Sequence, residues 1–193
     1  MLKVILILAG LALIVFLVGV GCQATRAGYK SAPYKVVRHA DGFEVRDYPA
    51  LILVETPMAN KGSDGSFSRL FNFISGRNAS KQKIAMTTPV FMAGNTTNTT
   101  MAFVMPATMD AARVPQPTDS AVTVRTIEPG HFAVFRYSGG RNPKNEAAAL
   151  ARLQAWMTAE KLAARSEPVY GYFDPPWTLT FLRRNEVMLR IDP

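Results

Sequence analysis

The sequence predicts an α+β fold in which a mostly antiparallel sheet carries two helices on one face. Short strand-like runs return through turns, as antiparallel strands do, and two further segments have the apolar spacing of helices. A strand–strand–helix–strand–strand order also occurs twice, roughly over 34–106 and 122–193. We therefore expect a pseudo-symmetric duplication (ββαββ twice), with a ligand groove between its halves.

Runs rich in β-branched and aromatic residues mark the expected strands. They are 34–38, 43–46, 51–56, 88–92 and 101–105 in the first half, and 122–127, 132–137, 169–173, 179–182 and 187–191 in the second. Asp41-Gly42 favours a hairpin turn, and Glu128-Pro129-Gly130 and 183–186 are the turns expected in the second half. The Pro-containing stretch 106–120 is interpreted as the connector between the halves.

Two segments have helical spacing. The first is marked by apolar residues at i, i+3, i+4 and i+7, which are Phe67, Leu70, Phe71 and Ile74. We expect Ser63 or Asp64 to cap its start and Gly76 to end it. The second is the Ala-rich stretch 142–164, whose leucine and methionine residues also recur at helical spacing.

An apolar segment precedes this fold. Residues 4–18 carry no charge, Lys3 provides a basic start, and small residues lead to Cys22. The apolar segment up to Cys22 is longer than a signal-peptide core, which has about 7–15 residues, and shorter than a membrane span, which has about 20. Three interpretations stay open. Residues 1–22 are a lipoprotein-type signal peptide that is lipidated at Cys22, or they are an uncleaved N-terminal membrane anchor, or they direct ordinary secretion.

Each of these interpretations brings the chain to a membrane or across it. We therefore expect an exported, membrane-associated protein of the bacterial periplasm or cell envelope. Residues 23–32 would be the linker and 33–193 the folded domain.

Composition and motifs exclude several function classes. Apolar residues make up 48% and charged residues 19%, which excludes a disordered tail. One cysteine excludes an intrachain disulfide and a Cys-rich zinc site. The net charge is +8, but the basic residues are scattered, so we expect no nucleic-acid partner. The chain has no nucleophile elbow, no His-Glu-x-x-His and no phosphate-binding loop, so catalysis is poorly supported.

Three segments resemble the SOUL haem-binding protein family. They are Phe-Glu-Val-Arg-Asp-Tyr at 43–48, Lys-Ile-Ala-Met-Thr-Thr-Pro-Val at 83–90, and Tyr-Phe-Asp-Pro-Pro-Trp at 172–177 leading to Arg-Arg-Asn-Glu-Val at 183–187. The resemblance covers about 33–193 and implies a twisted, mostly antiparallel eight-stranded sheet or barrel with two helices, built as a pseudo-symmetric duplication. That fold is similar to the effector-binding domains of some bacterial transcription regulators. It also implies haem or a related tetrapyrrole as the ligand. Asp47 stands where some relatives have an axial histidine, so the resemblance implies binding by apolar contacts and by cations at the propionates.

The candidate binding residues follow from that expectation. The first helix offers an apolar slot with a cation beside it, and a Trp in the 174–177 turn offers a rigid plane; the candidates are Phe67, Arg69, Leu70, Phe71 and Trp177. For each of them, ordinary core packing or a solvated helix surface remains the alternative. Nothing orients His39 or His131 toward a metal, so any iron ligand stays unknown. The methionines are interpreted as core packing.

The favoured function is therefore a non-catalytic, membrane-tethered binding protein for haem or a related porphyrin. An effector-binding-like module for another flat apolar small molecule is the second hypothesis. An enzyme that acts on tetrapyrroles is the third.

Overall fold

The computed structural model describes residue 10 and residues 28–59, 64–94 and 99–192, so the expectations for Ser63, Cys22 and the apolar segment lie outside the described residues. The strands are β1 (Lys30–Ser31), β2 (Lys35–Ala40), β3 (Phe43–Tyr48), β4 (Leu51–Met58), β5 (Thr87–Thr88), β6 (Val90–Gly94), β7 (Thr99–Val104), β8 (Thr123–Ile127), β9 (Gly130–Tyr137), β10 (Val169–Tyr172) and β11 (Asn185–Ile191). The helices are α2 (Ser66–Ile74) and α3 (Pro143–Ala159), with 3-10 turns η1 (Ala111–Arg113) and η2 (Thr180–Leu182). Among the described helices, none has both the length and the apolar character that a membrane crossing requires.

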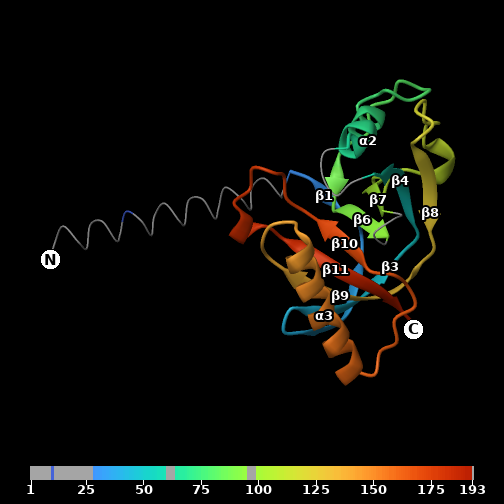
Figure 1. The fold of residues 1–193 in the computed structure, drawn as a ribbon. Helices are drawn as coiled ribbons and strands as arrows, with labels where there is room; N and C mark the ends of the chain where they lie inside the picture. Colours follow the sequence, from blue (N-terminus) through green and yellow to red (C-terminus); the bar gives the residue numbers. More distant parts are fainter. Residues whose placement is uncertain (1–9, 11–27, 60–63, 95–98, 193) are drawn as a thin grey trace.

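The α+β fold is confirmed, with two helices on a large antiparallel sheet (Figure 1). The strand order is β2-β3-β9-β11-β10-β6-β7-β4-β8, and the sheet is open rather than a closed barrel. It has nine strands instead of the expected eight. A separate parallel pair joins β1 to β5.

Eight of the nine strands follow the expected duplication. The units β3-β4-α2-β6-β7 and β8-β9-α3-β10-β11 have the same element order. From β3 toward the middle of the sheet the order is β3, β9, β11, β10, and from β8 toward the middle it is β8, β4, β7, β6. Strands at the same place in these two series are also at the same place in the two units, so the sheet order has the symmetry of the duplication. The ninth strand, β2, is an addition at the edge of β3. The repeat therefore starts at Phe43, and not at Tyr34 as the sequence suggested.

The sheet curls strongly along its width. Residues 49–50 join β3 to β4, and residues 128–129 join β8 to β9, yet each joined pair lies at opposite ends of the sheet. The expected hairpin turn at 128–130 is thus a crossover between distant strands. Such short crossovers require the two ends of the sheet to approach each other, and Tyr48 of β3 packs in one buried cluster with Leu51 and Leu53 of β4.

Both helices cover the convex face of the curled sheet. Met92, Tyr170 and Val187 are register partners across β6, β10 and β11, so their side chains share one face. Val187 and Tyr170 pack in the cluster that contains the α3 residue Leu153, and Met92 packs against the cluster beneath α2. The alternate side chains therefore line the concave face, which the helices leave uncovered.

Helix α2 begins one residue earlier than its apolar pattern. Its N-cap is Gly65, in a left-handed conformation with φ 79°, and no side chain caps it. The predicted cap Asp64 instead accepts a bond from the Ser66 amide, 3.0 Å from its Oδ1. The helix ends before Gly76, whose φ of 104° favours glycine, as expected.

The second half departs from the prediction in two places. Asn142 accepts the amide of Asn145 and starts α3, which ends at Ala159 rather than at 164. The run 179–182 is not a strand: its residues form the 3-10 turn η2 inside the loop between β10 and β11. A strand there was predicted from apolar residues that the structure leaves exposed, namely Leu179 and Phe181.

Candidate ligand-binding groove

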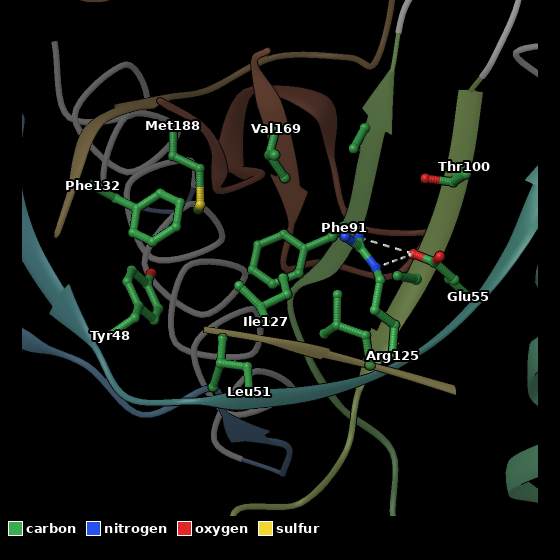
Figure 2. Close-up of a pocket in the computed structure, with 13 residues that line it drawn as sticks. Tyr48, Leu51, Glu55, Phe91, Thr100, Arg125, Ile127, Phe132, Val169 and Met188 are labelled. Atoms are coloured by element: carbon green, nitrogen blue, oxygen red, sulfur yellow. Dashed lines mark hydrogen bonds and ion pairs between the residues drawn. The ribbon is translucent and has the colours of Figure 1, made fainter. Parts of the chain in front are cut away.

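An apolar groove lies on the concave face, between the two halves of the fold (Figure 2). It comprises about 520 Å³ of space, including the part that is open to solvent. Its apolar wall comes from strands of both halves and is made mainly by Tyr48, Leu51, Phe91, Ile127, Phe132, Val169 and Met188. The groove thus has the aromatic and aliphatic lining that flat apolar ligands require.

One end of the groove is open and carries a cation. Arg125 of β8 donates from Nε to Oε2 of Glu55, at 3.1 Å, and the pair lies on the right-hand side of Figure 2. The Arg125 side chain is 53% exposed, whereas that of Glu55 is 18% exposed. Because the ion pair is exposed, it contributes little to stability. Its guanidinium can therefore turn toward an acidic group of a ligand at a low free-energy cost.

The other end of the concave face is sealed by a buried ion pair. Arg46 of β3 and Glu186 of β11 form two hydrogen bonds of 2.7 and 3.0 Å, and their side chains are 1% and 0% exposed. Arg46 also donates to Glu44 at 2.6 Å and to the hydroxyl of Tyr48 at 3.1 Å. This sealed network fixes Tyr48, which lines the groove, so the two ends of the face are physically connected.

The N-terminal strap, residues 32–34, covers this sealed end. Ala32 is buried in the same apolar cluster as Tyr48 and Met188. The ring of Tyr34 lies 4.1 Å from the guanidinium carbon of Arg46, and its hydroxyl is 3.4 Å from Nη2 of Arg184. The strap therefore fills one part of the crevice between the halves and leaves the groove as the remaining part.

Burial and the neighbouring charges shift the pKa values of Glu186 and Tyr48 in this network. Burial disfavours the ionised form of Glu186, but the hydrogen bonds and positive charges of Arg46 and Arg184 outweigh it and lower the pKa of Glu186. Burial raises the pKa of Tyr48 to about 12, although Arg46 opposes that rise. Glu186 is thus charged and Tyr48 is a neutral phenol at physiological pH.

The groove residues fit a porphyrin better than they fit its iron. The apolar wall suits the faces of the macrocycle, and Arg125 suits a propionate. Met188 contributes a soft thioether, which Figure 2 shows pointing into the groove, whereas the Tyr48 hydroxyl already accepts from Arg46. Met188 is nevertheless buried in the core cluster with Tyr48 and Phe91, so haem held here would rely on apolar contacts and one cation.

The two histidines lie outside the groove. His39 is 3.4 Å from Glu44 at the β2–β3 hairpin. His131 lies 4.0 Å from Asp47 on β9. Because Tyr48 faces the groove, Asp47 faces the opposite side of β3. Across residues 28–59, 64–94 and 99–192, no group of three or more His, Cys, Asp or Glu could hold a metal ion.

The candidate residues of α2 occupy three different environments. Leu70 is fully buried in the core, and Phe67 and Phe71 are 47% and 49% exposed with their rings stacked 6.0 Å apart. The Arg69 guanidinium donates to the Thr56 hydroxyl at 3.0 Å and to the Pro57 carbonyl at 2.8 Å. None of these residues lines the groove. Their role in ligand binding stays a prediction.

Trp177 lies apart from both α2 and the groove lining. It is 77% exposed in the loop between β10 and β11, and no ring contact with Phe67 or Phe71 accompanies it in the part of the chain that the structure describes. Trp177 is therefore not packed in the core, which was the alternative to a binding role. Its role as a pocket plane stays a prediction.

Sequence reasoning missed the groove wall. The alternation in β4 separates Leu51, Leu53 and Glu55 from their neighbours, but it does not show which side of the strand is concave. Glu186 bonds to Arg184, two positions before it in the chain, at 2.6 Å. The stronger partner, Arg46, lies 140 positions away in the chain and gave no local signal.

A sequence profile of the SOUL heme-binding protein family matches residues 29–190. The match covers both halves of the fold, the sealed network and the groove. No curated protein sequence matches the chain.

Solved structures share the fold at low identity. A hydrolase from Listeria innocua superposes with a TM-score of 0.62 at 11% identity, covering 81% of this chain and 94% of that one. An uncharacterized conserved protein from Listeria innocua gives a TM-score of 0.60 at 11% identity, with 78% and 92% covered. The C-terminal domain of EcmrR gives 0.56 at 10% identity, with 82% and 98% covered. These likenesses establish the architecture alone.

Proposed function

The chain belongs to the SOUL heme-binding protein family, and we propose that it is an exported, membrane-tethered protein that holds haem or a related tetrapyrrole reversibly in the concave groove. The observation that carries the location is the groove itself. It joins aromatic and aliphatic side chains of both halves, and it has a cation, Arg125, at its open end. A planar molecule with apolar faces and acidic substituents matches that arrangement.

The groove is favoured over the α2 surface because the candidate side chains of α2 are largely occupied by contacts within the protein. The guanidinium of Arg69 is occupied by neighbouring oxygens, and Leu70 is fully buried. Phe67 and Phe71 are exposed, but their rings are stacked on each other, and Phe67 also packs edge-on against the buried Phe103. Arg125, in contrast, lies at the rim of an apolar hollow.

Export and tethering are supported by residues 1–22 of the sequence. An uncharged stretch at 4–18 follows Lys3 and leads to Cys22. A lipidated Cys22 and an uncleaved anchor both place the domain at a membrane. The two differ in one experiment, because Cys22→Ala releases a lipoprotein from membranes and leaves an anchored protein in place.

Binding without chemical conversion is supported by the residues around the groove. The described lining has one carboxylate, Glu55, and it is paired with Arg125. No described histidine or cysteine lines the groove. Reversible holding of the ligand, as in storage or transfer, therefore fits the lining better than catalysis does.

A hemin titration of the full chain in lipid nanodiscs tests the function, with empty nanodiscs as the reference. We expect a saturable shift of the Soret band and no release of iron or of metal-free porphyrin. Porphyrin or iron in solution would establish an enzyme instead. A lack of any shift, with quenching of tryptophan fluorescence by another flat apolar compound, would establish the effector-binding-like alternative.

One variant separates the groove from a site that uses position 47. Asp47→His introduces the imidazole that some relatives carry, but on the side of β3 that faces away from the groove. We expect its hemin affinity and Soret position to equal those of the unmodified chain. A sharpened six-coordinate spectrum in this variant would move the haem site to the opposite side of β3.

A further inference from the structure

Three large apolar side chains project from one short loop. The Trp177 loop, which we define as residues 174–184, presents Trp177, Leu179 and Phe181 with 77%, 47% and 66% of their surfaces exposed. We propose that this loop docks the domain on the lipid bilayer and places these side chains in its interfacial region. This inference rests on the proposed membrane tether and adds a second, specific contact between the domain and the membrane.

The loop is held in this exposed conformation by its own hydrogen bonds. Nε of Arg183 donates to the Thr178 carbonyl at 2.8 Å, and the Arg184 amide donates to Oδ2 of Asp174 at 2.6 Å. The amide of Gly139 donates to the Thr180 carbonyl at 3.1 Å and fixes the loop to the neighbouring turn. These bonds stabilise the backbone conformation in which the three side chains are exposed.

Side chains of this kind favour a membrane interface. Burial of one large apolar side chain is worth about 1.5–3 kcal/mol. Trp is enriched at the headgroup level, where its ring is apolar and its N–H can still donate a hydrogen bond. Three such residues within five positions therefore offer substantial binding free energy to any surface that removes them from water.

The charge around the loop matches an anionic bilayer. Arg141 and the α3 residue Lys144 follow the adjoining turn, and the loop itself carries Arg183, whereas the charge of Arg184 is paired with Glu186 at 2.6 Å. The loop's one acidic residue, Asp174, accepts the Arg184 amide. Each Lys or Arg close to an anionic membrane surface contributes about 1 kcal/mol of attraction.

The tether enters the domain beside this loop. Seven residues, 23–29, separate Cys22 from β1, and they span at most about 25 Å. A domain of this size is about 40 Å across, so a tether of this length keeps it close to the membrane surface and favours contact by the side where the tether enters. The strap that follows β1 contacts the loop directly, since Tyr34 bonds to Arg184. In Figure 1 the described chain begins on the side from which the red-orange loop projects.

Single-tryptophan variants of the full chain test the contact. The chain has two tryptophans, so Trp156→Phe leaves Trp177 as the reporter. The matched control joins Phe67→Trp to Trp156→Phe and Trp177→Phe, because Phe67 is an exposed apolar residue on α2, away from the loop. Both proteins are reconstituted in vesicles of phosphatidylcholine and phosphatidylglycerol, with and without brominated acyl chains.

We expect brominated lipid to quench Trp177 at least twofold more than it quenches the tryptophan at position 67. Aqueous iodide should quench Trp177 several-fold less than the control. Co-flotation of each protein with the vesicles at high salt measures the tether separately.

Each other result overturns the inference in a recognisable way. A chain that floats with the vesicles while iodide still reaches Trp177 keeps the tether and removes the docking contact. A Trp177 that is shielded from both iodide and brominated lipid is covered by protein, such as a second copy of the chain. A chain that does not float removes the proposed tether and the docking contact with it.

Discussion

The two ends of the concave face use the same pair of residue types in opposite ways. At the sealed end Arg46 and Glu186 are almost completely buried, and the N-terminal strap covers them. At the open end Arg125 and Glu55 form a similar ion pair, but the Arg125 side chain is half exposed. An arginine on this face is therefore structural or available to a ligand according to what covers it, and not according to its partner.

The difference also explains why the groove lies where it does. The strap places Ala32 and Tyr34 over the sealed end, so the curled sheet has no free space there. The space between Phe91, Ile127 and Arg125 lies instead at the end where Arg125 is exposed to solvent. The same curvature thus produces a closed core at one end and an apolar hollow at the other.

The largest expected effect of this comparison is on stability. Glu186→Gln removes the fully buried carboxylate that Arg46 and Arg184 share and leaves Arg46 with Glu44 as its one carboxylate partner in the network, so we expect a loss of about 3–5 kcal/mol in the free energy of unfolding. Glu55→Gln is the matched change at the open end, where an exposed pair contributes about 0.2–1 kcal/mol. Urea denaturation followed by circular dichroism measures both. Similar losses in the two variants would contradict the distinction between the ends.

The second effect is on ligand affinity. Ala93 lines the groove on β6, and Ala93→Phe fills the space with a ring. We expect hemin affinity to fall at least tenfold, about 1.4 kcal/mol, because the ligand and the new side chain compete for one volume. Phe71→Ala removes an exposed ring of α2 and should leave the affinity unchanged. The reverse pattern would move the site to α2 and support the candidate residues there.

The third effect is on acid stability. The folded-state pKa of Glu186 lies below its ordinary value of 4.5, so the unfolded chain binds a proton more readily than the folded one. The stability that this carboxylate provides is therefore present above about pH 4.5 and is lost as the pH falls through its folded-state pKa. Asp64 acts in the same sense, because its bond to Ser66 lowers its pKa to about 2.

Unfolding of the unmodified chain and of Glu186→Gln between pH 6 and pH 3 isolates the Glu186 contribution, since Asp64 is common to both. We expect the unmodified chain to lose more free energy of unfolding over this range. Parallel pH profiles would show that Glu186 is not held ionised by the sealed network.

The smallest effect distinguishes the open end from an ordinary surface pair. Arg125→Gln should weaken hemin binding about three- to tenfold, with a smaller loss at high salt, because an exposed charge is screened. Arg165 pairs with Asp192 at 2.7 Å on an exposed surface outside the groove, so Arg165→Gln is the control. Equal affinities of the two variants would show that Arg125 does not face a ligand acid.

The fold was largely predictable because its signals are local. The helical spacing of Phe67, Leu70, Phe71 and Ile74, the turn at Asp41-Gly42 and the repeated element order all lie in short windows. The predicted strand at 179–182 was wrong because apolar residues were assumed to be buried, whereas the loop exposes them. The expected hairpin at 128–130 was wrong because a short connection was assumed to join neighbouring strands.

The groove was not predictable from the sequence in the same way. Its wall combines β3, β4, β8 and β11, whose contact depends on the curl of the whole sheet. The pairing of Arg46 with Glu186 likewise joins strands at opposite ends of the chain. Such non-local contacts leave no periodic signal in one sequence.

The most direct test of the central claim uses the methionines as reporters of where haem binds. Met188 lines the groove, whereas Met58 and Met101 lie in the core beneath α2. Spectra of methionine methyl groups, labelled with carbon-13, are recorded as paramagnetic hemin is added to the full chain. The account predicts that the Met188 signal broadens first and that those of Met58 and Met101 stay sharp; broadening of Met58 and Met101 with a sharp Met188 would contradict it.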